Sequence, residues 1–248
     1  MFLFKRPVVQ LPKVTAPSAA DLAAKAKVQP TSQAMLKPGM SSSEYIHTLE
    51  ENRQSVDAVN ALAHGMPERE SVHWACQSSR KVANKLNAED SAALAAAEAW
   101  VKTPDNATKA AAAAAASKTD FTGPGGWAAQ AAAWSQGTPG MALATPQAGQ
   151  TASAVAATPP AGLTAPAVAG AVLLAAGLVN RQPMPPAQKL AMPQMPTVAA
   201  PGIVLPQVAP PAGAPPAPPP VDQAKLAKPL QPFIDLGKDI ASGKNRWA

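Results

Sequence analysis

The sequence predicts an all-α protein: a small orthogonal or solenoid-like helical bundle with long disordered segments rich in proline and alanine. Three observations lead to this prediction. Apolar residues recur at helical spacing over residues 41–136. Helix start and stop signals divide that stretch into segments of ordinary helix length. Alanine supplies half of the 47% hydrophobic residues and the chain holds 29 prolines, so one continuous core over all 248 residues is not expected.

The predicted helical core domain, residues 41–136, begins with a capping box. Ser41 and Glu44 have the spacing at which each side chain bonds the other's backbone amide. The apolar stripe that follows is interrupted at Asn52, and Gly65 is expected to end this single helix in the left-handed conformation. Residues 1–40 contain scattered prolines, so we expect an extended N-terminal arm with a short helix within it.

Four more helices are predicted in the core. Pro67 stands at the start of the second, Asn87 caps the third, the alanine run 110–116 lies in the fourth, and the fifth follows the turn at 123–126. Alanine provides little area to bury, whereas each indole ring provides much. Tryptophan rings are therefore predicted to hold the core together, namely Trp74, Trp100, Trp127 and Trp134.

Four segments follow the core. We expect a low-complexity linker at 137–163, an alanine-rich helix at 164–180, a proline-rich linker at 181–224, and a C-terminal amphipathic helix at 225–248 with Phe233 and Ile240 on its apolar face. The proline-rich linker is interpreted as an extended spacer, with docking onto an aromatic groove as the alternative. The C-terminal helix either docks on the core or binds another protein.

Charge and cysteine content exclude several classes of function. The net charge is +6, but the positive charge lies in the flanks and residues 41–136 carry more acids than bases, which argues against nucleic-acid binding. A lone cysteine and the lack of a secretory signal lead us to expect a cytoplasmic protein. The uncharged stretch 165–179 is short and rich in alanine, so membrane contact is not expected.

Candidate chemistry is sparse. His73 and Cys76 lie one helical turn apart, and such a pair is a weak candidate for a zinc site or an activated thiol. No fourth ligand or nucleophile motif accompanies the pair, so we interpret it as a core cysteine beside a packing histidine. The glycines at 123–126 lack the Lys-Ser/Thr of a phosphate loop and are read as an interhelical turn. No catalytic residue, metal or cofactor is predicted.

Several motifs carry a resemblance to a known family. They are the segment 39–45, the run 58–76 with its Leu-Ala-His, Pro-x-Arg-Glu and Trp-Ala-Cys elements, the segment 97–101 followed by Pro104, the pair Trp127 and Trp134, and the closing segment 235–243. The sequence resembles an uncharacterised bacterial family of helical proteins encoded near type VI secretion system clusters, and it departs from that pattern at His73, where a second tryptophan is usual. The resemblance implies a cytoplasmic accessory role without catalytic residues and favours docking of the C-terminal helix.

We therefore expect a non-enzymatic adaptor that acts through protein–protein contacts in the type VI secretion setting, with secretion components as partners. The alternatives are a secreted or membrane-interacting, effector-like protein and a His/Cys metal-binding protein. The residues predicted to serve as structural or protein-contact positions are His64, Pro67, Arg69, His73, Trp74, Trp100, Trp127, Trp134, Phe233 and Ile240.

Overall fold

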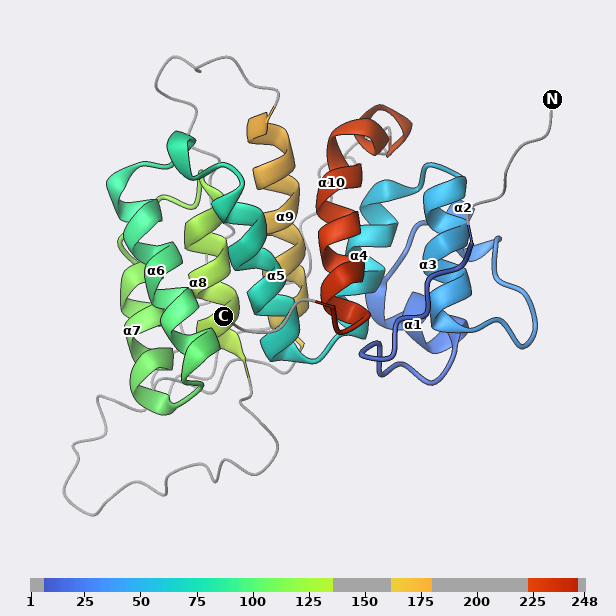
Figure 1. The fold of residues 1–248 in the computed structure, drawn as a ribbon, viewed down its shortest axis with the longest axis horizontal. Helices are drawn as coiled ribbons and strands as arrows, with labels where there is room; N and C mark the ends of the chain where they lie inside the picture. The colour runs from blue at the N-terminus through green and yellow to red at the C-terminus, as the bar shows by residue number, and fades with distance from the viewer. Residues whose placement is uncertain (1–6, 136–161, 180–222, 245–248) are drawn as a thin grey trace, which may run out of the picture.

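The computed structural model describes residues 7–135, 162–179 and 223–244, and within this part every regular element is a helix (Figure 1). The predicted all-α class is therefore confirmed. The expected linkers at 137–163 and 181–224 lie almost entirely outside the described residues. The helices are α1 (Ala19–Ala26), α2 (Pro30–Gln33), α3 (Ser42–Glu51), α4 (Ser55–Gly65), α5 (Glu68–Arg80), α6 (Ala88–Lys102), α7 (Asn106–Ala116), α8 (Pro124–Trp134), α9 (Thr164–Val179) and α10 (Gln223–Ala241), with a short 3-10 turn at Ala83–Lys85.

Two groups of helices stand side by side, and α10 lies between them (Figure 1). In the first group α8 is central and contacts α5, α6, α7 and α9. In the second group α4 is central and contacts α1, α3 and α10. Helix α9 touches both α4 and α5, so buried residues of the two groups form one continuous apolar core.

Alanine allows the first group to pack closely. Both buried positions of α7 are alanines, and α8 and α9 bury mostly alanine, so little side-chain volume separates these helices. The uncharged helix α9 buries its residues against α4, α5 and α8. No helix in the described part of the chain combines the length and apolarity needed to cross a membrane.

The single helix expected from Ser41 to Gly65 is instead two helices, α3 and α4. The predicted capping box of Ser41 and Glu44 is present at the start of α3. The helix then ends at Asn52, because Arg53 takes the left-handed conformation with φ 59°. The amide of Gln54 donates to the Leu49 carbonyl at 2.8 Å, and the Arg53 amide donates to Glu50 at 3.0 Å. These are the two hydrogen bonds of a Schellman motif, with arginine where glycine is usual.

The N-terminal arm is bound to the core over its described residues. The short helix expected within it is α1, capped by Ser18, and its Leu22 is fully buried. Before α1 the chain is non-helical as predicted, but Leu11 is buried and its amide donates to Ser43 Oγ at 3.1 Å. The segment that we expected to be a separate arm therefore supplies part of the apolar core.

Gly65 ends α4 for a different reason from the one predicted. Its φ is not positive; instead, a Cβ at this position would lie 2.8 Å from Val14 Cγ1 and 3.1 Å from Leu22 Cδ1. The Thr15 amide donates to the Gly65 carbonyl at 2.8 Å. Glycine is needed here because the arm crosses directly over the end of α4.

Asp90 joins α6 to the start of α8. It stands in the first turn of α6, as predicted, but it is buried and its Oδ1 accepts from the Gly126 amide at 2.6 Å. Gly123, the N-cap of α8, has no side chain to cap the helix, so the carboxylate of Asp90 performs this role from a neighbouring helix. Burial raises the pKa of Asp90, and the amides of Gly126 and Gly125 oppose that rise.

This close approach makes Gly125 intolerant of a side chain. An added Cβ would lie 2.2 Å from the Asp90 carbonyl oxygen, so we expect Gly125→Ala to lower the free energy of unfolding by ~1–3 kcal/mol. In Gly177→Ala the added Cβ meets nothing within 4 Å, and this control should gain ~0.5–1 kcal/mol as a helix-interior substitution. Urea denaturation followed by circular dichroism measures both, and equal stabilities would contradict the packing described here.

Candidate functional site

Trp74 of α5 is the centre of the contact between α5 and α10. Its side chain is fully buried, and Nε1 donates to the backbone carbonyl of Phe233 at 2.8 Å. A Cβ at Gly237 would lie only 2.7 Å from Cε2 of the indole. Since Phe233 and Gly237 are one helical turn apart, the ring lies directly on the backbone of α10.

The apolar face of α10 completes this contact. Phe233 and Ile240, both predicted to lie on that face, are buried with three neighbours, the whole set being Leu230, Phe233, Ile234, Ile240 and Ala241. Helix α10 contacts α4, α5 and α9 (Figure 1). The surface that these three helices form around Trp74, together with Glu50 of α3, is called the α10 seat below.

Glu50 provides the charged part of the seat. Lys238 Nζ lies 2.9 Å from Glu50 Oε2, and the side chains of Lys238 and Glu50 are only 16% and 9% exposed. Gln231 Nε2 also donates to Glu50 Oε1, at 3.1 Å. Removing the lysine would leave a largely buried carboxylate without its cation, which is costly. The seat therefore selects for a basic residue directly after Gly237.

The N-terminal arm closes the seat at the end of α10. The Lys13 amide donates to the carbonyl of Ala241, the last residue of α10, at 3.0 Å. Lys13 Nζ also lies 3.4 Å from Glu70 Oε1 on α5. The arm thus touches α10 and α5 at once and fixes the register of α10 on the seat.

Pro67 and Arg69 have structural roles at the start of α5 and at the end of α6. Pro67 is the N-cap of α5, directly before its first residue. Arg69 Nε donates to the Val101 carbonyl at 2.8 Å, and Nη2 donates to the Lys102 carbonyl at 3.2 Å. These are the last carbonyls of α6, which lack intrahelical partners and carry the negative end of the helix dipole.

His64 lines a pocket of about 820 Å³ where α1, α4, α5 and the start of α9 meet. Its Nδ1 lies 2.9 Å from the Asn60 carbonyl, and only a protonated Nδ1 can donate to a carbonyl. Burial lowers the pKa of His64, the hydrogen bond to Asn60 opposes this, and Lys27 and Lys25 lower it further. Opposite His64, Thr164 Oγ1 donates to Glu68 at 3.1 Å.

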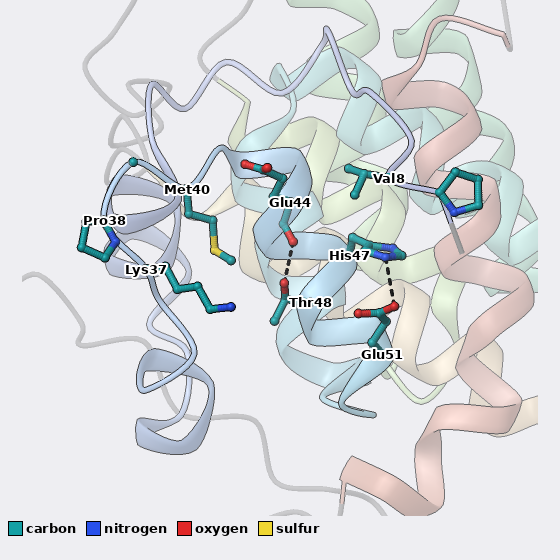
Figure 2. Close-up of a pocket in the computed structure, with 10 residues that line it drawn as sticks. Val8, Lys37, Pro38, Met40, Glu44, His47, Thr48 and Glu51 are labelled. Carbon is teal, nitrogen blue, oxygen red and sulfur yellow. Dashed lines mark hydrogen bonds and ion pairs between the residues drawn. The ribbon is translucent and has the colours of Figure 1, made fainter. Parts of the chain in front are cut away.

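A second pocket, of about 570 Å³, opens beside α3 (Figure 2). His47 Nε2 lies 3.2 Å from Glu51 Oε1, one turn further along α3; Val8 lies near His47, and Lys37 and Met40 lie across α3 from them. The carboxylate of Glu44 accepts from the Ser41 amide at 2.9 Å as part of the capping box. The acidic groups of this pocket are thus held by residues of α3 and its cap.

The surroundings of His73 and Cys76 disfavour a reactive thiol. Cys76 is buried, and burial raises the pKa of its thiol well above the usual range, so the thiol stays protonated at neutral pH. Burial is also the main cause that lowers the pKa of His73. Within residues 7–135, 162–179 and 223–244, no three His, Cys, Asp or Glu side chains gather as a metal site would require.

The other three tryptophans of the predicted core occupy different environments. Trp100 on α6 is buried, and its Nε1 has no hydrogen-bond partner among the described residues. Trp127 is half-buried, donates from Nε1 to the Phe121 carbonyl at 3.0 Å, and packs edge to face on the Phe121 ring. Trp134 is half-buried at the end of α8. Of the four tryptophans predicted to hold the core together, Trp74 and Trp100 lie at its centre, so we correct the prediction for Trp127 and Trp134: they pack at its edge.

Sequence reasoning missed the polar half of the seat. Glu50 stands beside Glu51 on a short amphipathic helix, and no spacing rule marks one of these two acids as the partner of a residue near the other end of the chain. The sequence marks Gly237 only as part of the closing motif 235–243. One signal could have indicated its role. Glycine disfavours a helix interior, so its position on the apolar face of a predicted helix suggests close packing at that point.

Comparison with known proteins gives a family. Residues 45–192 match the model of a family described as "Family of unknown function (DUF6931)". The chain belongs to this family. The matched residues, called the family segment below, include Glu50, Trp74 and the helices α4 to α9, but neither the arm nor α10. No curated protein and no solved structure matches the chain. The link to type VI secretion stays a prediction.

The burial of Trp74 leads to a stability prediction. Trp74→Ala removes a fully buried ring and the hydrogen bond to Phe233, so we expect the free energy of unfolding to fall by ~3–5 kcal/mol in denaturant titrations. Trp134→Ala is the matched control and should cost less, because that ring is half-buried. A Trp74→Ala effect within ~0.5 kcal/mol, the range of surface substitutions, would contradict the assignment.

Cys76 provides a test of chemical reactivity. Because its thiol is buried and protonated, an aromatic disulfide reagent should label the native protein slower than the urea-unfolded protein by on the order of 10²-fold or more, since labelling requires opening of the fold. The labelling rate is followed by absorbance of the released thiolate. Rapid stoichiometric labelling of the native chain would show an accessible thiolate and reinstate the catalytic hypothesis.

Proposed function

We propose that the protein is a non-enzymatic adaptor that acts through protein–protein contacts in the setting of bacterial type VI secretion. The α10 seat is the observation that carries the contact role. The family segment holds a helix from a distant part of the chain on a surface with apolar, hydrogen-bonding and charged components. These components match helix-in-groove recognition, one of the recurring ways in which proteins bind peptides.

The secretion setting is supported by the motifs that carry the family resemblance. Two of them, the Trp-Ala-Cys element of 58–76 and the closing segment 235–243, meet in space, since Trp74 lies against Gly237. Two of the motifs that suggest the setting therefore contribute directly to the seat. The secreted or membrane-interacting alternative depends on the uncharged stretch 137–180 and the alanine-rich helices. In the described part of that stretch, the buried residues of α9 already pack on other helices of the protein.

A pull-down tests this proposal. Full-length tagged protein isolated from its native host should recover subunits of the secretion machine, identified by mass spectrometry against a tag-only control. Deletion of the gene should reduce the amount of secreted protein. Recovery of no secretion subunit, together with unchanged secretion in the deletion strain, would reject the adaptor role in this setting.

A further inference from the structure

We propose that the α10 seat is the surface to which the adaptor's partner binds, and that the partner presents an amphipathic helix with the residue pattern of α10, which displaces α10 from the seat. This inference rests on the proposed adaptor function and adds the chemistry of the partner to it. The structure defines what such a helix needs, position by position.

The position facing Trp74 is the most restrictive. A Cβ at Gly237 would approach the indole to 2.7 Å, so the partner helix needs glycine there, and the backbone carbonyl one turn earlier accepts from Nε1 as Phe233 does. The next residue needs to be basic in order to pair with Glu50, as Lys238 does at 2.9 Å. Large apolar residues are required three and four positions before the glycine and three after it, where α10 buries Phe233, Ile234 and Ile240.

Helix α10 is a replaceable occupant because it is a weak helix by itself. Pro229 and Pro232 lie inside it, and each removes a backbone donor from the helical ladder. Without the seat such a segment would not hold its helical form in water. Its polar attachments to the rest of the protein are concentrated at Trp74, Glu50 and Lys13.

The position of α10 in the chain also fits this role. Residues 180–222 separate it from α9, and the family segment ends at residue 192, so the seat lies within the matched residues and its occupant lies outside them. Because α10 belongs to the same chain as the seat, its binding is intramolecular, and this competition sets a threshold for partner binding.

A partner of different sequence is favoured over a second copy of this chain. Exchange of α10 between two copies would replace each contact on the seat with an identical one, and each seat already holds its own α10. Exchange therefore gains no contact on the seat itself and loses freedom of movement on association. A partner helix that reaches beyond α10 gains new contacts.

The test uses full-length protein and a fluorescently labelled synthetic peptide of residues 223–244, with binding measured by anisotropy. In the Gly237→Leu chain the tethered helix can no longer lie on Trp74, so the seat is open and the peptide should bind at least ~10-fold more tightly than to the wild-type chain. Gly177→Leu is the matched control, because its added Cβ meets nothing within 4 Å, and it should bind as the wild type does. A peptide that itself carries Gly237→Leu should bind none of the chains.

A charge reversal keeps the test decisive if Gly237→Leu lowers the helix content of the chain. Lys238→Glu places a second acid beside Glu50 and weakens the tethered helix through charge alone, so this chain should also bind the wild-type peptide more tightly. If the peptide binds neither variant chain, the inference is overturned. A concentration-dependent dimer of the wild-type chain in light scattering, lost in both variants, would overturn it in favour of a second copy.

The two proposals fail separately. If the pull-down recovers equal amounts of secretion subunits with wild-type and Gly237→Leu protein, the adaptor role stands and the seat is not its binding surface. If the peptide binds as expected and no secretion subunit is recovered, the seat is a helix receptor and the proposed setting is wrong. Increased recovery with Gly237→Leu supports both.

Discussion

The contact between the Trp74 ring and the backbone of α10 is the constraint on which the arrangement of the helices depends. It joins residues 159 positions apart in the sequence and involves α10, the helix that lies between the two helical groups. The N–H of a buried indole usually has a hydrogen-bond partner, and for Trp74 α10 supplies both the partner and the apolar cover. Gly237 makes the close approach possible, and the pairing of Lys238 with Glu50 fixes the helix in register.

Close approach without large side chains is the second feature of the fold. Glycines let neighbouring groups come close: an added Cβ would lie 2.8 Å from Val14 Cγ1 at Gly65 and 2.2 Å from the Asp90 carbonyl oxygen at Gly125. Alanine likewise allows close packing of α7, α8 and α9, whose buried residues are mostly alanines. The core is thus stabilised by many short contacts, with a few large rings where gaps remain.

Local signals in the sequence account for much of the helix pattern, because caps are local. Ser41 and Asn87 each cap a helix through their own side chains, as predicted, and Ser18 does the same for α1. The break at Asn52 was not predictable as a helix end, since Arg53 takes a conformation that usually requires glycine. The cap of α8 and the charged part of the seat were missed because Asp90 and Glu50 act on distant segments, and no spacing rule reports contacts between elements.

The Trp-Ala-Cys element, which contains the candidate thiol Cys76, has a structural explanation. Trp74, Ala75 and Cys76 are all buried, and successive residues of a helix point about 100° apart, so α5 needs neighbours on several sides. It has them in α6, α8, α9 and α10. Of these four helices, α6, α8 and α9 belong to the family segment, whereas α10 arrives from beyond residue 192. The side of α5 that Trp74 occupies is therefore the one whose cover the family segment does not itself provide. In the proposed adaptor role, a partner helix would act by replacing that cover.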